Sequence, residues 1–191
     1  QYIQRMTEKG MQEEAMRETE LLCKDAEQRK DKYGMASGEM CIGYNHRVFG
    51  QNIKLCLEYY DSALKHFEEG KYYRDAYVVS LNIIQTYLAR QAYSDVLPYL
   101  DRLVLLRKTA EDKKVAIGEA LYMRYYQFRV IATLGLKGEK AAEPYIREAN
   151  VYYLQHKDAV SREGWIGYNI MCNQTLGNIR GAVAYMDSLI D

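Results

Sequence analysis

Proline is scarce in this chain, and long apolar runs are missing from it. The 191 residues include 2 prolines but 19 tyrosines. Because proline interrupts helices, and because no strand-like alternation of apolar and polar residues stands out, the sequence favours helices. No apolar stretch reaches the ~20 residues that span a bilayer, so no membrane span is expected in this segment. The first residues also lack the pattern of a secretory signal.

Net charge is absent as well. The chain has 26 basic and 26 acidic residues, and no long run of either sign. Proteins that bind nucleic acids neutralise phosphates with clustered positive charge, so we expect no nucleic-acid partner for this segment. The same balance argues against a polybasic membrane-binding patch.

Cysteines and histidines are few and scattered. The four cysteines match no zinc or redox spacing, which favours buried or half-buried thiols in a reducing compartment. No metal-binding or nucleophile motif appears, so we expect no catalytic residue, no metal, no cofactor and no enzyme activity. A cytoplasmic location is expected, and the periplasmic region of a membrane-bound sensor is the alternative. The cysteines are Cys23, Cys41, Cys56 and Cys172.

A repeated helical pattern is what the sequence does contain. A small or medium residue is followed four and seven residues later by residues that also suit burial, and this pattern recurs at intervals of 40–46 residues. Positions i, i+4 and i+7 lie on one helical face, so each segment predicts a helix that packs closely on a neighbour. The three residues of each helix, in chain order, are Ala15, Thr19 and Leu22; Cys56, Tyr60 and Ala63; Val96, Leu100 and Leu103; Ala142, Ile146 and Ala149; and Ala182, Met186 and Leu189.

A tyrosine follows the small residue by three positions in four of these helices. We expect its ring to pack on the next helix, with the hydroxyl at the edge. The functional alternative is a ladder of rings that binds aromatic or peptide ligands. The tyrosines are Tyr59, Tyr99, Tyr145 and Tyr185.

Other apolar-periodic segments lie between these helices, at residues 33–49, 73–90, 113–135 and 159–176. Glycines mark the joints, which is typical of helix ends. Two-helix units in series form an α-solenoid. We therefore predict an all-α single domain over residues 1–191 with four to five units. The units are 1–30 (partial), 31–70, 71–112, 113–158 and 159–191 (truncated), and the glycines are Gly10, Gly50, Gly70, Gly135, Gly138 and Gly177.

Several segments resemble tetratricopeptide repeats. The stretches GMQEEAMRE (10–18), NIKLCLEYYDSALKHFEEG (52–70) and GNIRGAVAYMDSL (177–189) resemble the second helix of that repeat, and IGYNHRVFG (42–50) resembles the first. The usual period is 34 residues, whereas the longer spacing here is similar to repeats of bacterial sensor kinases and transcription regulators. The resemblance implies a non-catalytic scaffold for a peptide or protein partner, within a larger bacterial signalling protein.

The first helices of similar repeats line a concave groove, which gives a set of candidate binding residues. Amides there would hold a peptide backbone, and Arg124 would hold a carboxylate. The segment YMRYYQFRV (122–130) is the most suggestive, because it also contains Arg129 among aromatic rings. The alternative is that these positions are ordinary solvated helix faces. The candidates are Asn45, Asn82, Gln85, Arg124, Gln127 and Tyr168.

Rival functions stay open at this point. The array would also serve as a structural spacer, or as an oligomerisation module that pairs through exposed apolar ends of the solenoid. An enzyme without a recognisable short motif is a third hypothesis. The first residue is Gln1 and a predicted helix runs to the last residues, so we expect an excised piece of a longer protein.

Overall fold

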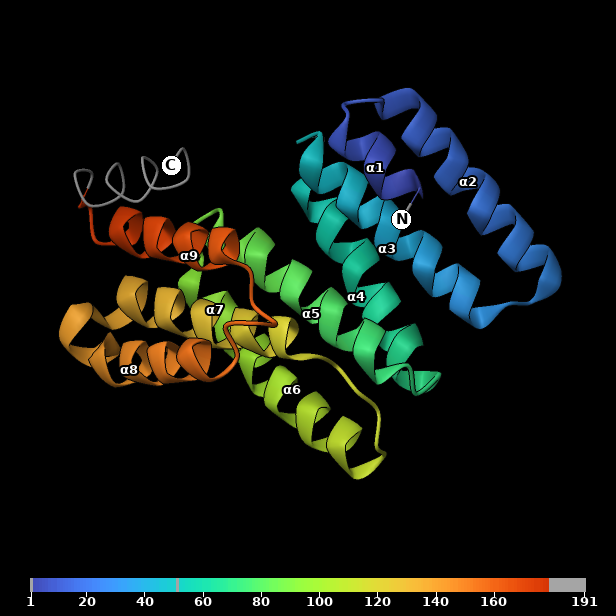
Figure 1. Cartoon of the computed structure of the whole chain (residues 1–191). Coiled ribbons are helices and arrows are strands. Elements are labelled where there is room, and N and C mark those ends of the chain that lie inside the picture. Colours follow the sequence, from blue (N-terminus) through green and yellow to red (C-terminus); the bar gives the residue numbers. More distant parts are fainter. Residues whose placement is uncertain (1, 51, 179–191) are drawn as a thin grey trace. The chain divides into compact units, whose positions relative to one another are not determined.

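The structure, a computed structural model, describes residues 2–50 and 52–178, and these residues form helices with no β-strand among them (Figure 1). This confirms the all-α prediction, while the stacking of units into a solenoid stays a prediction. The helices are α1 (Tyr2–Glu8), α2 (Gln12–Arg29), α3 (Lys32–Val48), α4 (Ile53–Glu69), α5 (Tyr73–Leu88), α6 (Tyr93–Asp112), α7 (Glu119–Lys137), α8 (Glu139–Gln155) and α9 (Arg162–Thr175).

The helices expected between the repeated ones are present as α3, α5, α7 and α9, and most of their ends agree within a few residues. The exception is α7, which begins at Glu119 and not at residue 113. The preceding helix continues to Asp112, and Gly118 then adopts a φ of 107°, which a helix cannot include. Apolar periodicity alone does not predict this loop between α6 and α7, because Ile117 in the loop is buried like a helical residue.

Contacts between Cα atoms divide the chain into two compact units. Unit 1 comprises Gln1–Thr86 and Leu105–Val115, and unit 2 comprises Tyr87–Val104 and Ala116–Asp191, so α5 and α6 contribute residues to both. In unit 1, α1 packs on α2 and α3, α2 packs on α3, and α3 packs on α4. In unit 2, α7 packs on both α8 and α9. Neighbours in sequence are thus neighbours in space within each unit.

The predicted columns of small and apolar residues are largely buried. The first column, represented by Ala15, Cys56, Val96 and Ala142, is 0% exposed in all four described helices. Each of these helices begins three residues before its small residue. Ile146 and Leu22 are only partly buried, so the stripe is less complete at those two positions. The last set, with Ala182, lies outside the described residues.

Close approach between paired helices explains why small residues recur. A Cβ added to Gly43 of α3 would lie 2.7 Å from Cδ1 of Tyr60 on α4, well inside van der Waals contact. The Tyr60 ring is itself fully buried, so it has little room to move aside. The bulky Tyr60 of the second column therefore requires Gly43 opposite it.

The column of tyrosines makes contacts that the prediction did not include. Each described ring contacts the preceding helix of its own hairpin, and packing on the next helix stays a prediction. The small residue brings the first helix of the hairpin close, and the tyrosine ring three residues later packs on that same helix. The contacts are Tyr59 with His46 (ring centroids 6.2 Å), Tyr99 with Tyr87 (5.9 Å) and Tyr145 with Arg129 (4.5 Å from Cζ to the ring).

Turn chemistry agrees only partly with the glycine pattern. Gly10, Gly50 and Gly138 adopt positive φ at joints, as expected. Gly70 has a φ of −78°, and the left-handed residue is the following Lys71. Gly135 was also expected at a joint, but it lies inside α7, where an added Cβ would meet the ring of Tyr93 at 2.3 Å. Its role is helix packing and not chain reversal.

The left-handed end of α2 gives a first prediction. Lys30 has a φ of 55° and its backbone N–H closes the helix on Ala26 and Glu27, so Lys30→Gly removes a steric cost without removing a bond. We expect stabilisation of about 0.5–1 kcal/mol, or a melting temperature about 2 °C higher, measured by circular dichroism. The matched control is Lys24→Gly in the middle of the same helix, which should destabilise by about 1 kcal/mol. Two changes of the same sign would contradict this account of the turn.

Candidate functional site

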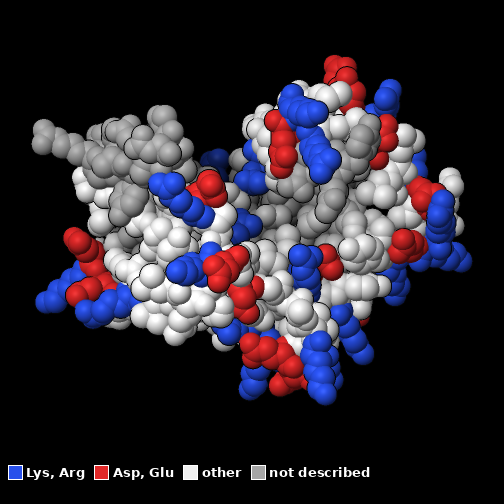
Figure 2. Space-filling model, viewed as in Figure 1, with Lys and Arg blue, Asp and Glu red and all other residues white. Residues whose placement is uncertain are grey.

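Clustered charge and metal-binding groups do not mark a site in the part of the chain that the structure describes. No group of three or more His, Cys, Asp or Glu side chains there is placed to hold a metal ion. On the face shown in Figure 2, basic and acidic side chains are interspersed, and neither sign forms a broad field. The candidate site must therefore be sought among pockets and local side-chain clusters.

Two clusters combine a hydroxyl, a glutamate and a histidine. In unit 1, the Glu39 carboxylate accepts a hydrogen bond from Ser62 Oγ at 2.8 Å and lies 2.8 Å from His66 Nδ1. In unit 2, the Glu119 carboxylate accepts a hydrogen bond from the Tyr152 hydroxyl and lies 3.6 Å from His156 Nδ1. In each case the glutamate is on the first helix of a hairpin, and the other two residues are four positions apart on the second helix or, for His156, at its C-cap.

The order of groups in these clusters favours a structural role. Nucleophilic catalysis places an imidazole between the hydroxyl and the carboxylate, so that it removes the hydroxyl proton. Here the carboxylate lies between the hydroxyl and the imidazole. Each cluster therefore joins the two helices of its hairpin, and a half-exposed pair of this kind contributes about 0–1 kcal/mol.

The cysteines are free thiols, and burial raises the pKa of each. The effect is large for Cys172, where burial raises the pKa to about 12. A thiol with a raised pKa carries little thiolate near neutral pH and is a poor nucleophile. These residues thus behave as packing residues.

The pocket with the most suggestive chemistry lies within unit 2, between α6, α7 and α8. It has a volume of about 290 Å³ and combines leucine and alanine walls with two cations, one carboxylate and two tyrosines. This volume lies at the lower end of the range that is typical of small-molecule pockets. We call it the Arg129 pocket; its lining is Leu97, Leu100, Asp101, Tyr125, Arg129, Thr133, Leu136, Lys137, Ala141 and Tyr145.

Aromatic rings hold the Arg129 guanidinium in place. Its Cζ lies 5.1 Å from the ring centre of Tyr125, 5.6 Å from that of Tyr126 and 4.5 Å from that of Tyr145. Arg129 Nη1 also donates to the Tyr125 hydroxyl at 3.1 Å. Burial raises the pKa of Tyr125, so the hydroxyl stays neutral. The cation is thus oriented before any ligand arrives.

The remaining contacts of Arg129 are incomplete. Its Nη2 donates to the carboxylate of Glu148 on α8, whose side chain is 49% exposed. Its Nε is buried and has no hydrogen-bond partner among the described residues. An N–H donor in that state costs about 1–3 kcal/mol relative to a bonded one. The guanidinium therefore has donor capacity that the described chain leaves unused.

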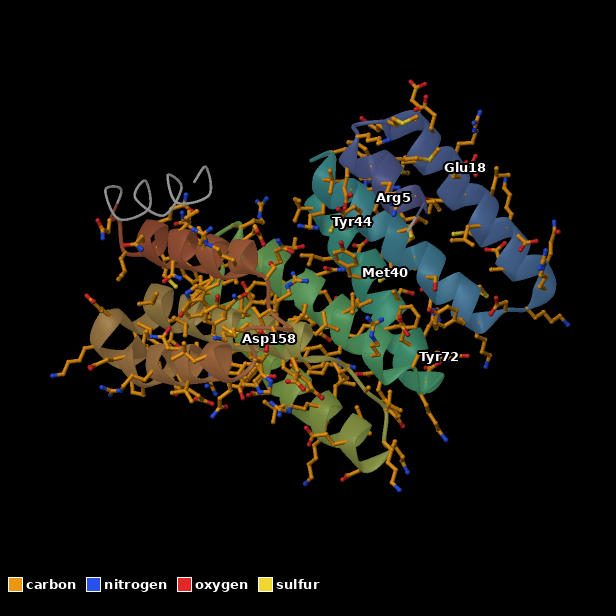
Figure 3. The ribbon with its side chains drawn as sticks, in the orientation of Figure 1. Arg5, Glu18, Met40, Tyr44, Tyr72 and Asp158 are labelled. Atoms are coloured by element: carbon orange, nitrogen blue, oxygen red, sulfur yellow. The ribbon has the colours of Figure 1, made fainter. Side chains whose placement is uncertain are left out.

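A second pocket, of about 520 Å³, lies within unit 1 between α1, α2 and α3. Its walls are mostly apolar or weakly polar, and Glu18 is its charged member. Figure 3 labels Glu18 on α2 and Met40 on α3, which both line it. A polar group with unused bonding capacity does not face this pocket in the way that Arg129 faces its own, so it ranks second.

The candidate residues predicted in unit 1 do not form one surface. Asn45 is 0% exposed, so it does not line an open groove. Its Oδ1 accepts from Thr7 Oγ1 at 2.6 Å and its Nδ2 donates to Thr19 Oγ1 at 3.3 Å, which ties α1, α2 and α3 together. Asn82 and Gln85 lie three residues apart on α5 and are half-buried.

Those predicted in unit 2 are also mostly internal. Gln127 is buried and donates from Nε2 to the Gly164 carbonyl at 3.4 Å, which joins α7 to α9. Tyr168 is buried, and burial raises its pKa. Arg124 is half-buried with its guanidinium 5.2 Å from the ring centre of Phe128. A binding role for these residues stays a prediction.

Sequence reasoning chose Arg124 for the carboxylate and did not nominate Arg129. Two of the rings around Arg129 are visible in the sequence, because Tyr125 and Tyr126 precede it by one helical turn. The third, Tyr145, was recognised as a column residue, but its contact with Arg129 depends on how α7 and α8 pair. Lys137 gives no signal beyond its position near a glycine joint.

Comparisons with known proteins supply no relative: no family model matches this chain, and no curated protein matches it. Among the described residues, no helix combines the length and apolar character needed to cross a bilayer. Function must be argued from the site alone.

The interior position of Asn45 generates a prediction. Asn45→Ala leaves the Thr7 and Thr19 hydroxyls without their amide partner and opens a small cavity, so we expect a loss of about 2–3 kcal/mol in unfolding free energy. Urea denaturation followed by circular dichroism measures it. The control is Asn82→Ala on half-buried α5, expected within about 0.5 kcal/mol of wild type. Equal small effects would show that the Asn45 bonds do not hold the three helices.

The reactivity of the cysteine thiols gives a second prediction for this part of the structure. Because burial raises the pKa of every cysteine, the thiolate fraction at about pH 8 is below that of an ordinary thiol. We expect the native chain to react with an aromatic disulfide reagent more than about tenfold slower than the chain unfolded in guanidinium. Absorbance of the released thiolate follows the reaction. A thiol that reacts in the native chain at the unfolded rate would contradict this account, and one that reacts faster would be an activated cysteine.

Proposed function

We propose that this chain is a non-catalytic helical-repeat scaffold that binds a peptide or protein partner, as the sensing or docking region of a larger bacterial signalling protein. The observation that carries the proposal is the Arg129 pocket, a pre-oriented cation at the edge of an apolar depression. Rigid side chains that keep their place before binding lower the entropy cost of association.

The hairpin architecture supports this proposal. Helices that follow one another in sequence pack on one another within each unit, and their small-residue columns are buried as helical repeats require. The resemblance to tetratricopeptide repeats, carried by segments such as 52–70, points to the same class. Scaffolds of this class present extended surfaces and not deep catalytic clefts.

The surface around the pocket suits a peptide. Leu97 and Leu136 line it and remain 44% and 39% exposed, so apolar side chains of a partner would bury them further. A small pocket beside partly exposed leucines is the arrangement by which helical surfaces anchor extended or helical peptides. The buried thiols and the order of groups in the two histidine clusters favour binding over catalysis.

Selection from a random peptide library displayed on phage tests this function. We expect wild-type chain to enrich a defined peptide family, and Leu97→Asp to weaken binding of those peptides by at least about tenfold, because it places a negative charge in the apolar pocket wall. Binding of synthetic peptides is measured by fluorescence anisotropy.

The matched control is Leu154→Asp on α8, a 68% exposed leucine that does not line the pocket. This variant should bind the selected peptides as wild type does. Failure to enrich any peptide would count against the function, and equal loss in both variants would count against the site.

A further inference from the structure

We propose that the Arg129 pocket receives a carboxylate side chain of the partner, which takes the place of Glu148 on the guanidinium. This inference rests on the proposed function for the nature of the ligand, a peptide. It adds the chemical group that the pocket selects and the intramolecular contact that this group displaces.

The contact between Glu148 and Arg129 uses one of the two donors on one edge of the guanidinium. In an arginine, Nη2 and Nε form the side edge of the guanidinium, and a carboxylate binds this edge with both oxygens. Glu148 accepts from Nη2, while Nε has no hydrogen-bond partner among the described residues. A carboxylate that approaches along the plane of the edge would accept from both nitrogens.

Glu148 is suited to exchange. Its side chain is 49% exposed, whereas that of Arg129 is 21% exposed. When Glu148 leaves the guanidinium, its carboxylate has water available, while the cation stays fixed by its rings and by the Tyr125 hydroxyl. The exchange thus replaces one carboxylate by another at a cation that does not move, and exposed pairs of this kind are weak enough to give way.

The rest of the lining selects among anions. Lys137, in the last turn of α7, adds a second positive charge, and the leucine walls accommodate the methylene groups of a glutamate or aspartate side chain. Asp101 also lines the pocket and repels negative charge. A singly charged carboxylate is therefore favoured over a phosphate group, which carries close to two charges.

The test uses a small probe with a single free carboxylate, N-acetyl-glutamate N-methylamide, and its glutamine analogue. The readout is the side-chain Nε–H resonance of Arg129 in nitrogen-15 NMR spectra, assigned as the signal that Arg129→Lys removes. We expect a saturable shift of this resonance with the glutamate probe and none with the glutamine analogue. We also expect weaker binding by the phosphoserine counterpart.

Two matched variants test the exchange itself. Glu148→Gln removes the resident carboxylate from an exposed position, so the glutamate probe should bind about two- to fivefold more tightly. The control is Glu143→Gln, which frees another α8 arginine, Arg147, from its carboxylate partner at 2.9 Å outside the pocket. That variant should leave probe affinity unchanged.

The outcomes separate this inference from the proposed function. Equal shifts with both probes, tighter binding of phosphoserine, or no gain in Glu148→Gln would overturn the carboxylate exchange. If phage-selected peptides bind but ignore Glu148→Gln, the function stands and this inference falls. If no peptide is selected while the Arg129 resonance still titrates, the pocket is a carboxylate site and the proposed function falls.

Discussion

Close approach of two helices at a small residue is the constraint on which the other features of this chain depend. Ala15, Cys56, Val96 and Ala142 are completely buried at the same position of successive second helices. A longer side chain there would separate the hairpin, and neighbouring rings would lose their partners. The glycine of α3 that meets Tyr60 shows the same constraint from the other helix, since a single added carbon would collide with the ring.

Buried polar groups of the described residues divide into those that are hydrogen-bonded within the scaffold and those without a partner, which are His46 Nδ1, Arg47 Nε, the Tyr60 hydroxyl and Arg129 Nε. Asn45 uses both its oxygen and its nitrogen in bonds to two threonines, so three helices share one satisfied network. Arg129 also lies largely inside the protein, yet its Nε is unsatisfied among the described residues. Folded proteins leave few such donors, because each costs stability that packing must offset. The Asn45 network is therefore complete, whereas the Arg129 guanidinium keeps an unpaired donor.

The features that the sequence predicts correctly are those that depend on local patterns within one helix. Helix positions and the small columns depend on spacing within one helix. They agree with the described structure apart from the start of α7 and the partly buried Leu22 and Ile146. The face that each first helix shows to solvent depends on other helices, which is why Asn45 was placed in a groove although α1 covers it. Of the three tyrosine rings around Arg129, those of Tyr125 and Tyr126 can be predicted from the sequence because they lie one helical turn before it. The contact with Tyr145 depends on the pairing of α7 with α8.

Recurrence within the chain helps to separate scaffold from function. The tyrosine after each small residue packs against the first helix of its hairpin in all three described cases, so the ring itself belongs to the scaffold. The residue opposite that ring varies: it is His46 in α3, Tyr87 in α5 and Arg129 in α7. Packing a ring requires only a flat or extended neighbour, and the first two satisfy that requirement without a fixed charge. Arg129 differs from these two by its permanent charge. The proposed carboxylate site rests on that charge together with the pocket beside it, since a buried Nε without a partner also occurs at Arg47 on α3.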